Sequence, residues 1–101
     1  MDIRGQVVVE EFKRKHARSR RPLDSWKKVT ENAVWKSFLE IRDTFNSADS
    51  CTKDDVTYVI FDIAGNKYRL ITEIDYAGTL AVVALVMTHA EYSKDRWKDK
   101  L

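Results

Sequence analysis

Three apolar runs in the second half of the chain constrain its fold more than any other feature. They cover residues 56–63, 68–75 and 80–87, and they are rich in β-branched and aromatic side chains. Gly65-Asn66 separates the first two runs, and Ala77-Gly78 separates the last two. Gly and Asn both tolerate a positive φ, which is typical of a two-residue hairpin loop. The pattern therefore predicts a three-stranded antiparallel meander.

Helical periodicity replaces this pattern in the first half. In a first expected helix, apolar residues recur at three- and four-residue steps, at Val8, Val9, Phe12 and Ala17. Residues 2–4 could form a short strand before that helix. Pro22 is the only proline, and it suits the first turn of a helix, so a second helix should begin there. The apolar face of the second helix should consist of Leu23, Trp26, Val29 and Ala33.

A third helix is expected over about residues 36–45, where apolar side chains again follow a helical spacing. Residues 46–55 are rich in Ser, Asp, Asn and Thr and are expected to form a loop. A polar, mostly helical tail should begin near Ala90. Helices followed by a meander predict an α+β fold, in which N-terminal helices pack on a small antiparallel β-meander and a short C-terminal helix follows.

The length of 101 residues predicts a single domain over residues 1–101. Its longest apolar run, Leu80–Met87, has eight residues, whereas a membrane span needs about 20, so no membrane association is expected. The N-terminus lacks the apolar stretch of a secretory signal. Cys51 is the only cysteine and cannot form an internal disulfide. A cytoplasmic location is therefore expected.

Positive charge gathers in one segment although the net charge is only +2. Residues 13–21 contain six cationic side chains and no acidic one: Lys13, Arg14, Lys15, Arg18, Arg20 and Arg21. A local basic surface favours a polyanionic partner, either a nucleic acid or an acidic protein. The alternative is a solvated helix face that only confers solubility, and the charges alone leave both open.

Turn lengths predict which residues of the meander face one another. With two-residue loops, Asp62 lies opposite Arg69, Arg69 lies opposite Val86, and Lys67 lies opposite Thr88. The face expected to enter the core carries Val59, Phe61, Ile63, Tyr68 and Leu70. One end of the sheet then gathers six polar or aromatic residues: Asn66, Lys67, Arg69, His89, Glu91 and Tyr92.

These side chains suit chemistry on a phosphodiester. A guanidinium binds phosphate oxygens, an ammonium stabilises developing negative charge, and an imidazole transfers protons near neutral pH. Each residue also has a simpler interpretation, because Arg69 could pair with Asp62 or Glu73, His89 could cap a helix, and Tyr92 could pack. No Cys, His or carboxylate cluster has metal-ligand spacing, and no Gly-rich phosphate loop is present. The residues alone predict a polyanion-binding domain and leave catalysis open.

The same residues carry a resemblance to a known family. Residues 59–70 (Val-Ile-Phe-Asp-Ile-Ala-Gly-Asn-Lys-Tyr-Arg-Leu) and 88–92 (Thr-His-Ala-Glu-Tyr) resemble the HigB toxins of bacterial type II toxin–antitoxin modules. Weaker matches extend the resemblance over nearly the whole chain. It implies a RelE-like fold and cleavage of messenger RNA, generally on the ribosome, without a metal or other cofactor. It also implies a neutralising helix-turn-helix antitoxin of the HigA type.

The implied reaction is attack of the RNA 2′-hydroxyl on the adjacent phosphate, which leaves a 2′,3′-cyclic phosphate and a 5′-hydroxyl. The implied catalytic residues are Arg69 for the phosphate, His89 as general acid or base, Lys67 for electrostatic stabilisation, and Tyr92 for stacking or orientation. The residues expected to bind RNA are Asn66, Glu91, Lys13, Arg14, Arg18, Arg20 and Arg21.

Two positions depart from the family pattern. Asp62 stands where the family often has Asn, and its negative charge beside Arg69 could compete with phosphate. Ser93 stands where an Asp is common. The alternative function is a non-catalytic RNA- or protein-binding module with the same fold.

Overall fold

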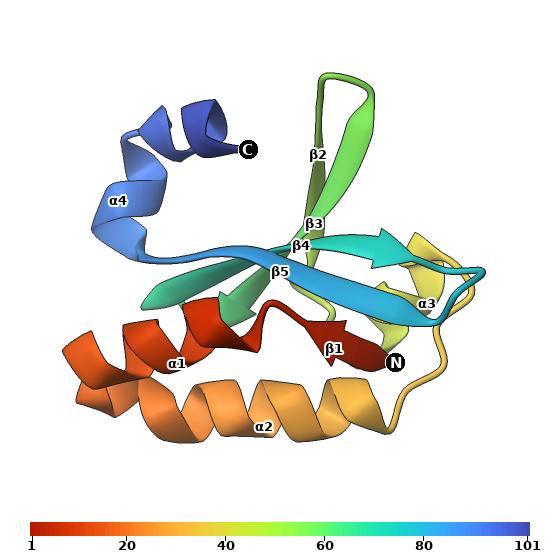
Figure 1. Ribbon diagram of the computed structural model, residues 1–101, viewed down its shortest axis with the longest axis horizontal. Coiled ribbons are helices and arrows are strands. Elements are labelled where there is room, and N and C mark those ends of the chain that lie inside the picture. The colour runs from red at the N-terminus through yellow and green to blue at the C-terminus, as the bar shows by residue number, and fades with distance from the viewer.

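The computed structural model describes residues 1–101 as helices on one side of a mixed five-stranded sheet and a short C-terminal segment on the other (Figure 1). The elements in chain order are β1 (Asp2–Arg4), α1 (Gln6–Lys15), the 3₁₀ turn η1 (Ala17–Ser19), α2 (Arg20–Glu31), α3 (Phe38–Thr44), β2 (Asp49–Lys53), β3 (Val56–Ile63), β4 (Tyr68–Asp75), β5 (Leu80–Thr88), α4 (His89–Ser93) and the 3₁₀ turn η2 (Arg96–Lys100). The expected α+β class is confirmed. No helix is both long enough and apolar enough to cross a membrane.

The sheet order is β1-β5-β4-β3-β2, with β2 to β5 antiparallel and β1 parallel to the start of β5. The expected short strand at residues 2–4 is therefore present. Gly5 follows it at φ 80°, and a Cβ there would lie 2.4 Å from the Val83 carbonyl oxygen. Only glycine fits this left-handed, close-packed position, which turns the chain from β1 into α1.

The register of the β3–β4 hairpin is as predicted, with Asp62 opposite Arg69 and Ile63 opposite Tyr68. The next hairpin begins as predicted, with Asp75 opposite Leu80, but its far end is shifted by one residue. Arg69 lies opposite Met87 rather than Val86, and Tyr68 rather than Lys67 lies opposite Thr88.

A β-bulge causes this correction. Thr72 pairs with Val83 and Ile71 pairs with Leu85, so Ala84 has no partner in β4. Two residues of one strand then oppose one of the other, which a turn-based register cannot foresee. Beyond the bulge, Leu85 and Met87 lie on the same face as Arg69.

The main core lies between the helices and one face of the sheet. It includes the five expected sheet residues from Val59 to Leu70, together with Trp26 and Trp35. On α2 the expected face is partly wrong, because Val29 is 38% exposed whereas Thr30 is fully buried. Thr30 lies four residues after Trp26, a spacing that places both on one helix face.

Residues 49–53 form strand β2, so the expected loop over residues 46–55 is wrong in its centre. This strand is at the edge of the sheet and is largely exposed, which allows a polar sequence. It pairs with β3, and the hydroxyl oxygens of Thr52 and Thr57 lie 3.1 Å apart.

The second face of the sheet is also covered. Ile60, Ile71 and Met87 pack there against Trp97 from η2, in a cluster separate from the main core. In Figure 1 this C-terminal segment lies on the side of the sheet opposite α1 and α2. Both faces of β4 are therefore buried around Arg69, which is 7% exposed.

Candidate nucleic-acid interface

Arg69 is the most constrained member of the predicted site. Its Nε forms an ion pair with Asp62 Oδ1 at 3.0 Å, and its Nη1 donates to the carbonyl oxygens of Asn66 and Tyr68 at 3.2 and 3.1 Å. Its Nη2 donates to the Asn66 side-chain oxygen. A guanidinium carries five N–H groups, so these three hydrogen bonds leave donors for a ligand. Arg69 thus pins the β3–β4 turn to the sheet, and the ion pair with Asp62 agrees with its simpler interpretation.

Tyr92 places an aromatic ring over this guanidinium. The Arg69 Cζ lies 5.0 Å from the centroid of the Tyr92 ring, within cation–π range. Tyr92 in turn stacks on Trp97, with centroids 5.3 Å apart and planes inclined by 17°. Burial raises the pKa of the Tyr92 phenol above its ordinary value, although Arg69 acts in the opposite direction. The phenol is therefore protonated at neutral pH and can donate a hydrogen bond.

Lys67 and His89 meet through their backbones. The His89 N–H donates to the Lys67 carbonyl oxygen at 2.9 Å, which joins the start of α4 to the turn before β4. Both residues are exposed, so both side chains can reach a ligand. The His89 Nε2 lies 3.5 Å from the Ser93 hydroxyl oxygen. That hydroxyl also donates a hydrogen bond to the His89 carbonyl oxygen.

Glu91 has a structural role. Its Oε1 accepts from the backbone N–H and hydroxyl of Thr88, at 3.2 and 3.1 Å, while the Glu91 N–H donates to the Thr88 hydroxyl. This reciprocal capping box fixes where α4 begins. It thereby sets the positions of His89 and Tyr92 relative to β5.

The cationic side chains of residues 13–21, from the end of α1 to the start of α2, are exposed with one exception. Arg14, Lys15, Arg18, Arg20 and Arg21 are all exposed, and none forms an ion pair. We call these five residues the basic turn. Two of them occupy the first turn of α2, where the helix dipole disfavours cations. A position that is unfavourable for stability points to a role in binding.

Lys13 departs from the expected RNA-binding set. It is 8% exposed, and its ammonium contacts Asp24 and, at 3.1 Å, Glu10. Its charge is already balanced inside the protein, so we leave it out of the binding surface. Burial alone would lower the pKa of Lys13, but the hydrogen bonds to the two carboxylates raise it above 10.5.

This raised pKa predicts an alkaline loss of stability. The folded state favours the charged ammonium, so the contribution is fully present below the ordinary pKa of 10.5 and disappears as the pH rises through the raised value. Lys13→Met should therefore unfold more easily than the wild type near neutral pH, and the difference should shrink above pH 10.5. Urea denaturation near neutral pH and above pH 10.5 measures the difference in stability between the variant and the wild type. The same difference at both pH values would contradict the prediction.

The basic turn lies at the same end of the sheet as the predicted site. Phe12 and His16 stack on each other with centroids 4.2 Å apart, and both approach Tyr68, with centroid distances of 5.5 and 6.1 Å. Tyr68 is paired with Thr88, the residue before His89. The last turn of α1 is thus anchored beside the junction of β4, β5 and α4.

The structure joins Arg69 to Asn66 and Tyr92 by side-chain contacts, and Lys67 to His89 through the backbone. Sequence reasoning missed the stacking partner Trp97, whose indole N–H donates to the Tyr92 carbonyl oxygen at 3.0 Å. A lone tryptophan in a charged tail was the available signal. No group of three or more His, Cys, Asp or Glu side chains is arranged to hold a metal ion.

The fold and this site define an α+β domain with a cationic sheet end suited to a polyanion. A family model described as "HigB_toxin, RelE-like toxic component of a toxin-antitoxin system" matches residues 19–95, more than half of the chain. The chain therefore belongs to the HigB toxin family. It is also similar to a protein named mRNA interferase HigB from Escherichia coli, with 29% identity over 94 residues that cover 93% of this chain and 90% of the relative. The family resemblance stated from the sequence is confirmed.

Proposed function

We propose that this protein is the toxin of a toxin–antitoxin module and that it cleaves messenger RNA as an endoribonuclease. The family supports the toxin role, and the name of the similar Escherichia coli protein supports messenger RNA as the substrate. The single observation that supports the chemistry is that Arg69 contacts Tyr92, and Lys67 is bonded to His89 through the backbone, where β4, β5 and α4 join.

The proposed reaction needs only the RNA and this chain's side chains. The 2′-hydroxyl gives its proton to a general base as it attacks the adjacent phosphorus, the bond to the 5′-oxygen of the next nucleotide breaks, and that oxygen takes up a proton from a general acid. The products are a 2′,3′-cyclic phosphate and a 5′-hydroxyl. No metal or other cofactor enters this scheme.

The geometry supports a division of roles. Arg69 supplies a fixed positive charge and its remaining N–H groups to the phosphate, because its hydrogen bonds from Nη1 and Nη2 to the β3–β4 turn hold it in place. Lys67 adds a mobile positive charge. His89 is exposed beside Lys67 and transfers the protons. Tyr92 donates a hydrogen bond, since its phenol stays protonated at neutral pH and its ring already contacts Arg69 and Trp97.

The exposed basic turn would contact the backbone of messenger or ribosomal RNA without reading sequence. We propose that cleavage occurs on translating ribosomes and that a helix-turn-helix antitoxin, HigA-like, neutralises the toxin. A ribosomal substrate places the protein in the cytoplasm.

One observation favours the alternative, a non-catalytic RNA-binding module. The ion pair between Arg69 and Asp62 already offsets the positive charge that a phosphate would use. In that case RNA binding would depend on salt but would generate no cleaved ends.

The experiment is to map transcript ends after the protein is induced without an antitoxin. We expect new ends that carry a 5′-hydroxyl and, on the upstream fragment, a 2′,3′-cyclic phosphate. In translation extracts, a message with a 2′-deoxy residue at a mapped cleavage position should survive there and still be cut elsewhere. Cleavage at the deoxy position would refute the mechanism, and binding without any new ends would support the non-catalytic alternative.

A further inference from the structure

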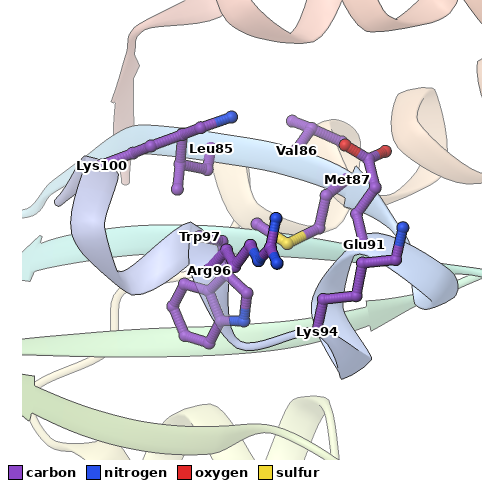
Figure 2. A pocket seen from close by; sticks show the side chains of 8 residues that line it. All are labelled: Leu85, Val86, Met87, Glu91, Lys94, Arg96, Trp97 and Lys100. Atoms are coloured by element: carbon purple, nitrogen blue, oxygen red, sulfur yellow. The ribbon is translucent and has the colours of Figure 1, made fainter.

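A cavity of about 290 Å³ lies between β5 and the C-terminal segment. Its walls come from the part of β5 beyond the bulge, from α4 and from η2 (Figure 2). The lining residues are Leu85, Val86, Met87, Glu91, Lys94, Arg96, Trp97 and Lys100. In Figure 2 Met87, Arg96 and Trp97 occupy the middle of the view, and the charged ends of Lys94, Lys100 and Glu91 lie around them. The cavity thus combines an apolar wall with a charged rim.

The rim holds three cations without a fixed partner. Lys94, Arg96 and Lys100 are exposed, and none of them forms an ion pair. The neighbouring Lys98, by contrast, pairs with Asp95 at 3.5 Å. Three uncompensated cations around a small cavity attract an anion. Arg96 adds a planar donor group that matches phosphate oxygens.

Glu91 decides what kind of anion fits. Its Oε1 accepts the capping hydrogen bonds from Thr88, and its Oε2 has no partner. A carboxylate beside the wall repels the side chains of an acidic peptide. It accepts hydrogen bonds from the N–H groups on the edge of a nucleobase. The combination of an apolar wall, one acceptor and three cations therefore favours a nucleotide over an acidic protein segment.

The cavity is also connected to the proposed active site. Trp97 forms part of the cavity wall and stacks on Tyr92, which in turn covers Arg69. A strand of RNA whose phosphate lies near Arg69 could place a neighbouring nucleotide here. The volume lies near the lower end of the ~300–1,000 Å³ typical of ligand cavities, which suits one nucleotide.

We propose that this cavity binds one nucleotide of a single-stranded RNA, next to the nucleotide that is cleaved. The base packs against Leu85 and Met87 with its N–H edge toward Glu91. Lys94, Arg96 and Lys100 hold the flanking phosphates. The inference rests on the proposed function for its substrate. The family match ends at residue 95, so Arg96, Trp97 and Lys100 lie outside it.

The test uses a short RNA that carries 2′-O-methyl groups at every position and cannot be cleaved by 2′-hydroxyl attack. It is titrated into isotope-labelled full-length protein while the Trp97 indole and Met87 methyl signals are followed by NMR. We expect both signals to shift with the same dissociation constant. The indole signals of Trp26 and Trp35, which are buried in the main core, should stay in place.

Two double variants that remove the same charge from different places test whether the cations of the cavity rim bind the RNA. Arg96→Gln combined with Lys100→Gln should weaken RNA binding about tenfold. The slope of the logarithm of the binding constant against the logarithm of salt concentration should fall in magnitude by about 1.4, since each phosphate contact of a single strand contributes about 0.7 to that slope. Lys27→Gln combined with Lys28→Gln removes the same charge from α2 and should change binding less than about twofold. Equal weakening by the two pairs would overturn the proposal. So would an oligoglutamate peptide that displaces the RNA from the Trp97 signal at lower concentration than the RNA itself.

The binding readout separates this inference from the proposed function. If the wild type cleaves transcripts but the Trp97 and Met87 signals do not shift, the nucleotide-binding role of the cavity is refuted and the proposed nuclease function stands. If both signals shift but no unmodified transcript is cleaved, the proposed nuclease function is refuted and the nucleotide-binding role of the cavity stands.

Discussion

Arg69→Gln should reduce RNA cleavage by about 100-fold or more, because a preorganised donor aimed at developing phosphate charge contributes about that much to a rate. The guanidinium is held by Asp62 and by the Asn66–Tyr68 turn, so it is positioned before a substrate arrives. Glutamine keeps a neutral hydrogen-bond donor but removes the charge. The measurement is the rate of transcript cleavage in a translation extract, together with growth after induction.

Asp62 provides the matched control for this experiment. Removing Arg69 alone leaves a partly buried carboxylate without its partner, which could unfold the protein and imitate a loss of catalysis. The double variant Asp62→Asn with Arg69→Gln avoids this and should remain folded and inactive. Asp62→Asn alone should cleave faster than the wild type, because the Asp62 carboxylate no longer competes with phosphate for the Arg69 charge. A folded double variant with wild-type cleavage would contradict the role of Arg69.

Trp97→Ala should lower the free energy of unfolding by about 3–5 kcal/mol, the usual effect of removing a large buried aromatic side chain. Trp97 is 5% exposed and fills the second cluster with Ile60, Ile71 and Met87. Its loss would also release Tyr92 from its stack and from the indole hydrogen bond. Urea denaturation followed by circular dichroism measures the change.

Two further variants serve as controls for the stability change in Trp97→Ala. Trp97→Phe keeps an aromatic ring but loses the indole N–H, so most of the stability should return. Leu39 is 75% exposed, and Leu39→Ala should change stability by no more than about 0.5 kcal/mol. If Trp97→Ala is no more harmful than Leu39→Ala, the C-terminal segment does not hold the second face of the sheet.

The meander could be predicted because its signals are local. Gly65 and Asn66 fix a short loop, and a loop of known length dictates which residues pair across β3 and β4. The same reasoning brought Arg69, Asn66 and Tyr92 to one end of the sheet. The start of α4 at His89 is within one residue of its expected position near Ala90, because the apolar run of β5 ends at Met87 and the sequence then becomes polar.

The remaining features depend on tertiary contacts that no local pattern reveals. Strand β2 is polar because it is an edge strand, and its partner β3 rather than its own sequence makes it a strand. Lys13 looks like a member of the basic segment, but the position of Asp24 on α2 gives it an ion-pair partner. Trp97 stacks on Tyr92 because the C-terminal segment folds back across the sheet, and no local sequence pattern predicts that contact.

The single unpaired residue in β5 allows this strand to lose one residue without changing the side of the sheet that its later side chains face. Val83 and Leu85 already point to opposite sides, because their partners Thr72 and Ile71 are neighbours in β4. Deleting Ala84 would make Val83 and Leu85 neighbours as well, so Met87 would stay opposite Arg69 and α4 would stay beside the turn at Lys67. A one-codon deletion of Ala84 should therefore leave the toxin folded and active, and growth after induction of the deletion variant measures this.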